Sequence, residues 1–224
     1  MKRLVIIDGK SVFYRGYYAM GALSTSEGMP TGGIYGFAAI AMEIVRKLDP
    51  TKVVVAWDSK TSANQRKAIY PEYKAGRTKP GEDFYAQIPA LEELVKALGW
   101  SFVEVDNYEA DDIIGTLALQ ADQETDCSQE DVLGSDSGNL QDAMKVELNA
   151  DSSQDAIDDE LGSSCSTSGW ETYIVSSDLD MLQVVDENTR MYRLLKGFTR
   201  LEELDVPAVE EKYGIRKAQF LDLK

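Results

Sequence analysis

Three short apolar runs in this chain each end at or just before an acidic residue, and helix-length stretches separate them. The runs are Leu4–Ile7 before Asp8, Val53–Trp57 before Asp58, and Tyr173–Val175 before Asp178, and Ser101–Val105 alternates as a further strand. Between them, residues 32–46, 89–98 and 109–121 have the length and apolar spacing of helices. This alternation predicts an α/β fold with a mostly parallel central sheet and helices on both faces. Ligands in such sheets bind at the carboxyl ends of the strands, which is where the acids lie.

Seven acidic side chains are expected to gather at that edge. Glu109 and Asp112 are three residues apart at the start of a helix and share a helix face, and Asp178 and Asp180 point the same way if that segment is extended. Crowded carboxylates repel one another unless a cation lies between them, and hard divalent cations prefer oxygen ligands. The chain has no histidine, which removes the commonest zinc ligand and the commonest general base. We therefore predict a Mg²⁺ or Mn²⁺ site formed by Asp8, Asp58, Glu109, Asp111, Asp112, Asp178 and Asp180.

Each of these acids also has a structural interpretation when it is taken alone. Asp8 and Asp58 are typical of turns that follow a strand. Asp106 forms a capping box with Glu109 if the helix begins there. Asp178 is a candidate helix N-cap, with Asp180 in the first turn. The metal prediction therefore depends on the set of seven rather than on any one member.

Negative charge is concentrated in one segment of the chain. The 224 residues carry a net charge of −16, and residues 123–168 hold twelve acidic residues and one lysine, or −11, which leaves −5 for the rest. That segment is also poor in large apolar residues, so we expect a disordered acidic insertion there, within a single domain of residues 1–224. With the segment set aside, the remaining surface is balanced enough to carry a local basic patch.

We expect no targeting segment at the start of this sequence. Only four strongly apolar residues precede Asp8, which is too few for a signal peptide or a membrane span. The two cysteines, Cys127 and Cys165, match no metal-binding spacing. We expect a reduced, cytoplasmic protein with no membrane association.

A basic segment follows Asp58 directly. Between residues 59 and 80, the cationic side chains are opposed only by Glu72, and Tyr70 and Tyr73 interleave with them. The cations are Lys60, Arg66, Lys67, Lys74, Arg77 and Lys79. Basic groups beside aromatic rings suit a phosphate backbone and stacked bases. Alone, the segment is also consistent with a solvated loop, but its place beside a predicted metal site favours nucleic-acid binding.

Six short motifs occur in a specific order along the chain. They are Ile7–Gly9, Pro30–Phe37, Trp57–Lys60, Tyr73–Arg77, Tyr108–Asp112 and Ser177–Asp180. Together they resemble the 5′-nuclease domain of bacterial DNA polymerase I, within the flap endonuclease family, and the resemblance covers residues 1–122 and 170–224. It implies a PIN-like three-layer α/β fold. It also implies metal-dependent hydrolysis of phosphodiester bonds in 5′ flaps and in nicked or gapped duplex DNA.

The resemblance also implies roles for individual residues. The seven acids would be the ligands of two Mg²⁺ or Mn²⁺ ions in the complete domain. Lys74 and Arg77 would hold the scissile phosphate, and Arg66 joins them at the base of a helical arch through which a 5′ strand passes. The other expected DNA-binding residues are Lys60, Lys67, Tyr70, Tyr73 and Lys79. The implied partners are DNA with a 5′ flap, nick or 5′ end, an RNA primer, and polymerase domains that follow in the same polypeptide.

The chain departs from the family pattern in two places. The family passes quickly from the Glu-Ala-Asp-Asp helix to the Ser-Asp-x-Asp strand, whereas residues 123–168 intervene here. The family also continues into a Gly-Asp-x-Ser-Asp-Asn segment and a helix–hairpin–helix, whereas this sequence ends at Lys224. One alternative function is therefore a non-catalytic DNA-binding module, inactive because its last metal-site aspartates are missing. Another is a phosphotransfer domain with the Asp-x-Asp of residues 178–180, although Met181 stands where that motif needs Thr or Val.

Overall fold

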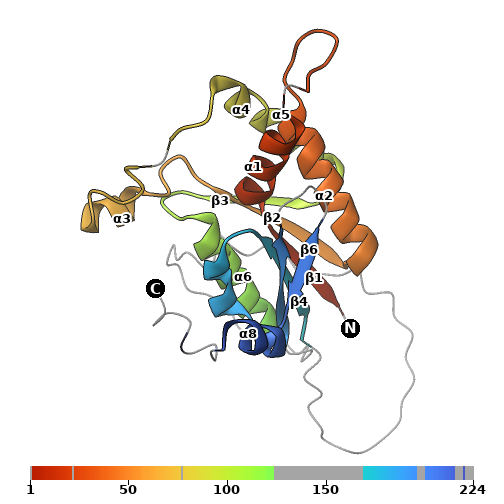
Figure 1. Cartoon of the computed structure of the whole chain (residues 1–224), viewed down its shortest axis with the longest axis vertical. Coiled ribbons are helices and arrows are strands. Elements are labelled where there is room, and N and C mark those ends of the chain that lie inside the picture. Colours follow the sequence, from red (N-terminus) through yellow and green to blue (C-terminus); the bar gives the residue numbers. More distant parts are fainter. Residues whose placement is uncertain are drawn as a thin grey trace, which may run out of the picture.

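One mixed sheet forms the centre of the molecule. The structure, a computed structural model, describes residues 2–21, 23–76, 78–123, 169–195, 200–214 and 219. Within those residues the strands are β1 Arg3–Asp8, β2 Lys52–Asp58, β3 Ser101–Val105, β4 Glu171–Ser176, β5 Thr189–Leu194 and β6 Leu201–Leu204. They lie in the order β3-β2-β1-β4-β5-β6 (Figure 1). Strands β1 to β5 run parallel and β6 is antiparallel to β5, which confirms the predicted α/β class with a mostly parallel sheet.

Alternation along the central strand sends its side chains into two separate cores. On β1, Leu4 and Ile6 belong to one core and Val5 and Ile7 to the other, and all four are at most 1% exposed. Ile6 is paired with Ile174 on β4, so the strand is flanked by apolar neighbours as well. Aliphatic side chains on both faces are typical of a parallel sheet that helices cover on each side. The carboxyl ends of the parallel strands therefore meet at one edge.

One face of the sheet is covered by the helices α1 Gly9–Met20, α2 Gly32–Leu48, α4 Glu82–Ala86 and α5 Ile88–Ala97 (Figure 1). Their buried side chains pack with those of the sheet in a single core, which includes Phe13 of α1, Phe37 of α2, Phe84 of α4 and Leu91 of α5. The opposite face is covered by α6 Ala110–Gln123, the 3₁₀ helix η1 Leu179–Val184 and α8 Val206–Tyr213. The short helix α3 Asn64–Ile69 buries no residue and projects beyond both layers (Figure 1).

Helices α1 and α2 meet at a pair of glycines. A Cβ atom added to Gly36 would stand 2.2 Å from the Cα of Gly16, a distance that no side chain tolerates. The absence of side chains at these two positions lets the helix backbones touch. The first turn of α2 is held in addition by Gln87, whose Oε1 accepts hydrogen bonds from the backbone N–H of Gly33 at 2.8 Å and of Ile34 at 3.4 Å. This packing fixes α1, the helix that begins directly after Asp8.

The predicted strands and helices are present, with ends shifted by one or two residues. The sequence did not predict the helices α1, α3, α4 and α8 or the strands β5 and β6. Of the two conformations considered for Asp178–Asp180, the extended one is not found, because η1 begins at Leu179 and Asp178 is its N-cap. Residues 124–168 of the predicted insertion lie outside the described residues, and Gln123 is the last residue of α6. Every helix in the described part of the chain is too short or too polar to cross a membrane.

Candidate metal centre

Asp8 is the last residue of β1 and the N-cap of α1. Its Oδ1 accepts a hydrogen bond from the backbone N–H of Ser11 at 3.0 Å, and its Oδ2 accepts one from the hydroxyl of Ser176 at 2.6 Å. The residue is only 6% exposed. Burial raises the pKa of Asp8 to about 6, and the charges of Asp58 and Asp178 add to the rise against the two hydrogen bonds. The N-cap role and proximity to other acids therefore coexist in one side chain.

Asp58 ends β2 and connects that strand to the start of α6. Its Oδ1 accepts a hydrogen bond from the backbone N–H of Ala110 at 2.8 Å. Its Oδ2 lies 3.2 Å from the Nζ of Lys10, a residue of the first turn of α1. The pair is partly exposed, so its contribution to stability is small. Its structural effect is to bring a cation to the carboxyl edge beside the acids.

Glu109 is buried, at 2% exposed, and three side chains of the basic segment donate to it. Lys74 Nζ lies 2.7 Å from Oε1, the hydroxyl of Tyr73 lies 3.0 Å from Oε2, and Arg66 also pairs with Oε2. A buried carboxylate requires such partners because an unpaired charge in the interior is strongly destabilising. Burial alone would lower the pKa of Lys74, but the hydrogen bond to Glu109 and its charge outweigh burial and raise it.

Asp112 completes the start of α6. It accepts a hydrogen bond from the backbone N–H of Glu109 at 3.0 Å and pairs with Arg66 at 2.9 Å. The helix begins at Ala110, so the residue that closes its first turn is Asp112. The capping box considered between Asp106 and Glu109 is therefore wrong, since Glu109 itself stands at the position before the helix.

Asp111 lies close enough to four other acids for their charges to raise its pKa. Burial, followed by the charges of Asp8, Asp178, Asp58 and Glu109, raises the pKa of Asp111 to about 7. We call these five residues the carboxylate cluster. They come from β1, β2, the start of α6 and the turn after β4, so the predicted convergence of separate strand ends occurs.

Asp178 and Asp180, the two predicted ligands that follow β4, are more exposed than Asp8 and Glu109. Asp178 is exposed and caps η1 by accepting a hydrogen bond from the backbone N–H of Asp180 at 3.0 Å. Its charge nevertheless acts on Asp8 and Asp111, so it belongs to the carboxylate cluster. Asp180 lies in the first turn of η1 and is half-buried. The N-cap interpretation of Asp178 is confirmed, and it does not remove the residue from the cluster.

The basic segment divides into an inner and an outer set. Arg66, Tyr73 and Lys74 contact the acids, and the backbone of Lys74 has a φ of 57°, in the left-handed region. The outer set, Lys60, Lys67, Tyr70 and Lys79, is exposed to solvent. Arg77 lies outside the described residues.

Sequence reasoning missed three residues that contact the acids, Lys10, Ser11 and Ser176, and a fourth, Ser177, that contacts Ser11. Ser11 and Ser177 lie with their hydroxyl oxygens 2.5 Å apart, and the backbone N–H of Ser177 also donates to Ser11 at 3.1 Å. Ser176 donates to Asp8, as described above. The signal was present, because Ser11 comes three residues after a strand-end Asp and the other two serines come directly before Asp178.

The chemistry of this donor set fits a hard divalent cation. The cluster offers carboxylate oxygens, the ligands that Mg²⁺ and Mn²⁺ prefer. Lys10, Arg66 and Lys74 compensate Asp58, Glu109 and Asp112, but no lysine or arginine of the described residues forms an ion pair with Asp8, Asp111 or Asp178. No three acidic side chains in the described ranges already surround one point as the ligands of an ion would. The fit therefore lies in charge and ligand type rather than in a closed ligand shell.

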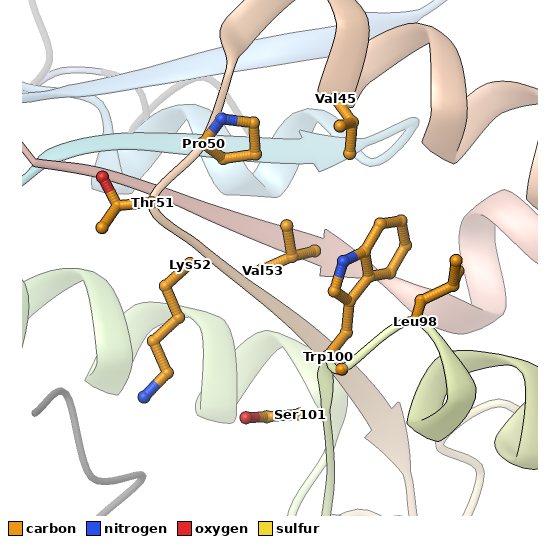
Figure 2. Close-up of a pocket in the computed structure, with 9 residues that line it drawn as sticks. Val45, Pro50, Thr51, Lys52, Val53, Leu98, Trp100 and Ser101 are labelled. Atoms are coloured by element: carbon orange, nitrogen blue, oxygen red, sulfur yellow. The ribbon is translucent and has the colours of Figure 1, made fainter. Parts of the chain in front are cut away.

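A separate pocket lies at the opposite ends of β2 and β3. Its volume is about 260 Å³, and Figure 2 shows Lys52, Trp100 and Leu98 among the side chains that line it. Lys52 begins β2 and Asp58 ends it, so the length of the strand separates this pocket from the carboxylate cluster. It supplies none of the predicted site residues.

Comparison with known proteins agrees with this geometry. The chain matches the family model described as 5′-3′ exonuclease, N-terminal resolvase-like domain, over residues 3–161. It is 32% identical over 223 residues to DNA polymerase I of Bacillus caldotenax and 32% identical over 224 residues to DNA polymerase I of Bacillus subtilis. Both matches cover 100% of this chain and 20% of the relative, so the chain spans about a fifth of the length of these relatives.

Solved structures extend the comparison to the fold. The T5 D15 protein co-crystallized with metal ions matches with a TM-score of 0.65 at 14% identity, and the T5 5′-exonuclease with bound zinc ions with a TM-score of 0.62 at 15% identity. Each match covers 100% of this chain and 65% of the other. At these identities the likeness concerns the fold, and it confirms the expected PIN-like α/β arrangement. The family match over residues 3–161, with the strand-end acids in place, shows that this chain belongs to the 5′-3′ exonuclease family as its N-terminal resolvase-like domain.

Proposed function

We propose that this chain is a divalent-metal-dependent 5′ nuclease that hydrolyses phosphodiester bonds in DNA. The observation that carries the proposal is the contact between opposite charges at one edge of the sheet. A cluster of five carboxylates lies there, and Lys74 and Arg66 reach one of its members, Glu109. Carboxylates suit a metal ion and cations suit a phosphate, so this edge would supply both halves of a phosphodiesterase site.

The acids that form no ion pair with a lysine or arginine among the described residues are the main candidates to hold Mg²⁺ or Mn²⁺. They are Asp8, Asp111 and Asp178, with Asp58, Glu109, Asp112 and Asp180 as neighbours that complete the set. The raised pKa values of Asp8 and Asp111 reflect burial and negative charge in excess of what the chain itself neutralises. When bound, such an ion lowers the pKa of a water molecule and stabilises a departing oxygen.

The cationic residues would bind and orient the DNA. Lys74 and Arg66 would turn from Glu109 and Asp112 toward the scissile phosphate, and Arg77 would act beside them. The exposed outer set of Lys60, Lys67, Tyr70 and Lys79 would contact neighbouring phosphates and bases. Phosphate contacts carry no sequence information, so selection would follow the structure of the DNA rather than its sequence.

The proposed substrates are 5′ flaps, nicks and gapped duplexes, with an RNA primer as a further 5′ strand. The relatives named above are DNA polymerase I proteins, of which this chain matches 20% of the length. We propose that the activity serves primer removal and repair in the cytoplasm, and that polymerase domains follow in the same polypeptide.

A non-catalytic DNA-binding module is the second candidate, and one observation favours it. Lys10, Arg66 and Lys74 already occupy oxygens of three of the acids, so much of the negative charge is neutralised without an ion. Such a module would bind DNA by its exposed lysines and would have no need for Asp8, Asp111 or Asp178.

Cleavage of a duplex with a labelled 5′ flap, in Mg²⁺ and in EDTA, separates the two functions. We expect cutting that requires the metal, and loss of cutting in Asp111→Asn and Asp178→Asn with DNA binding retained. The matched control is Asp106→Asn, an exposed acid close to the same helix start. Binding of the flap without cleavage in any divalent metal would support the module instead.

A further inference from the structure

Ser176 is a fully buried hydroxyl between two acids of the carboxylate cluster. It is the last residue of β4 and is 0% exposed. Its hydroxyl donates to Oδ2 of Asp8 at 2.6 Å, and its oxygen accepts a hydrogen bond from the backbone N–H of Asp178 at 3.0 Å. A serine hydroxyl has a single proton to donate, and here that proton is directed at a carboxylate.

These two hydrogen bonds link the carboxylate of Asp8 to the backbone of Asp178. The N–H of Asp178 fixes the orientation of the Ser176 oxygen, and the Ser176 proton then fixes one oxygen of Asp8. The other oxygen of Asp8 is held by the backbone N–H of Ser11 at 3.0 Å. The plane of the Asp8 carboxylate is therefore set by two donors from different elements, and each oxygen keeps a lone pair for a further partner.

A second link between the same two turns supports this arrangement. Ser11 and Ser177 lie with their hydroxyl oxygens 2.5 Å apart, and the backbone N–H of Ser177 donates to Ser11 at 3.1 Å. The turn after β1 and the turn after β4 are thus connected twice, once through Ser176 and once through Ser177. These contacts hold the turn that carries Asp8 against the turn that carries Asp178.

We propose that Ser176 is a positioning residue for the metal centre: it orients the Asp8 carboxylate and sets its place relative to Asp178. The inference rests on the proposed metal-dependent function and adds a residue that does not itself bind the ion. Ligating carboxylates are commonly held by hydrogen bonds of this kind, and loss of such a partner lowers metal affinity by about 10–100-fold.

The test is a titration of the DNA-free protein with Mn²⁺ by calorimetry. Ser176→Ala removes the hydroxyl and should weaken Mn²⁺ binding by about 10-fold or more. Ser176→Thr keeps a hydroxyl and should restore most of the affinity. The control is Thr172→Val, which removes a hydroxyl from a residue 1% exposed on the same face of β4, four positions away, and should leave Mn²⁺ affinity unchanged.

Two further readouts separate positioning from a general loss of structure. Thermal melting without metal should show Ser176→Ala folded, with a change similar to that of Thr172→Val. In flap cleavage, Ser176→Ala should need more Mg²⁺ for half-maximal rate, with an unchanged KM for DNA. Wild-type Mn²⁺ affinity in Ser176→Ala, or an equal loss in Thr172→Val, would overturn the inference while the nuclease proposal stands. Failure of the unsubstituted chain to bind Mn²⁺ would overturn both.

Discussion

The Nζ of Lys74 lies 2.7 Å from Oε1 of Glu109, although 35 residues separate them in the chain. This contact joins the basic segment after β2 to the residue directly before α6. Glu109 retains Tyr73 and Arg66 as partners if Lys74 is removed. The function of Lys74 can therefore be tested without leaving a buried charge unpaired.

Lys74→Ala should reduce flap cleavage by about 10²–10³-fold, the usual loss when one charged donor to a reacting group is removed. The slope of log K against log salt for flap binding should fall by about one unit, because one phosphate contact is lost. Arg77→Ala should act in the same direction. Lys79→Ala, at an exposed site, is the control, because loss of this cation should weaken DNA binding without a separate effect on the cleavage step. An unchanged salt slope in Lys74→Ala would place this residue away from the DNA.

Asp111→Asn should stabilise the metal-free protein near neutral pH while abolishing metal-dependent cleavage. The pKa of Asp111 is about 7 in the folded chain against 3.8 as its ordinary value. Between those values the folded state binds more protons than the unfolded state, so stability falls as the pH rises through about 7. Asparagine carries no charge, so the variant does not lose this stability at higher pH. Its Tm should rise by roughly 2–4 °C for each kcal/mol of repulsion relieved. A lower Tm than wild type at pH above 7 would contradict this account.

Stabilisation by added metal should depend on pH. Asp8 and Asp111 have raised pKa values of about 6 and about 7, so a metal must displace their protons in acid but not in mild base. The Tm increase caused by a fixed Mn²⁺ concentration should be larger at about pH 8 than at about pH 5. Differential scanning fluorimetry at the two pH values measures it, with Asp111→Asn as the comparison that should show a smaller difference. An equal increase at both pH values would exclude these two acids as ligands.

Gly36→Ala should destabilise the fold by about 1–3 kcal/mol, as expected for overpacking. The added Cβ would stand 2.2 Å from the Cα of Gly16, and neither backbone can move without shifting a helix. Gly115→Ala is the matched control, because a Cβ there meets nothing within 4 Å. Alanine in that helix interior should be neutral or stabilising by about 0.5–1 kcal/mol. Denaturant unfolding of both variants gives the comparison, and equal stability of the two would show that the α1–α2 contact relaxes freely.

Replacing residues 124–168 with a short Gly-Ser turn should leave the Tm nearly unchanged. A Cβ on Gly169 would lie 3.7 Å from the carbonyl oxygen of Ala121, so the end of α6 and the start of β4 are already adjacent. Loop-length entropy varies slowly, and a turn joins such ends without strain. The replacement removes a charge of −11, so DNA affinity should rise at low salt and converge with wild type at high salt. Unfolding of the shortened chain would show that the segment contributes to the core.

The strands and helices that the sequence predicted are those with an uninterrupted apolar pattern. Helix α1 was missed because two of the four residues that it buries, Gly9 and Gly16, are glycines, which indicate a turn rather than a helix. Strand β5 was missed because Arg190 and Arg193 interrupt it, and both are paired with glutamates on neighbouring strands. Ion pairs across strands cannot be inferred from one strand alone.

The sequence predicted that acids would gather at one edge of the sheet, but not which side chains would contact them. Asp8 and Asp58 end strands and Asp178 follows one, and the topology of a parallel sheet brings such positions together. The partners Lys10 and Ser176 depend on the direction of side chains after each strand ends, which a pattern of apolar residues does not determine. The 3₁₀ helix after Asp178 was not predicted either, because so short a helix leaves no apolar periodicity to detect.

Lys10, Arg66 and Lys74 give the acidic edge of the sheet internal counter-ions. Small domains that rely on a metal for folding come apart when a chelator removes it. Here three of the acids are neutralised by the polypeptide itself, and the two cores lie on either side of a sheet that needs no ion to close. Chelation should therefore leave the chain folded, so that its architecture does not depend on the supply of divalent cations.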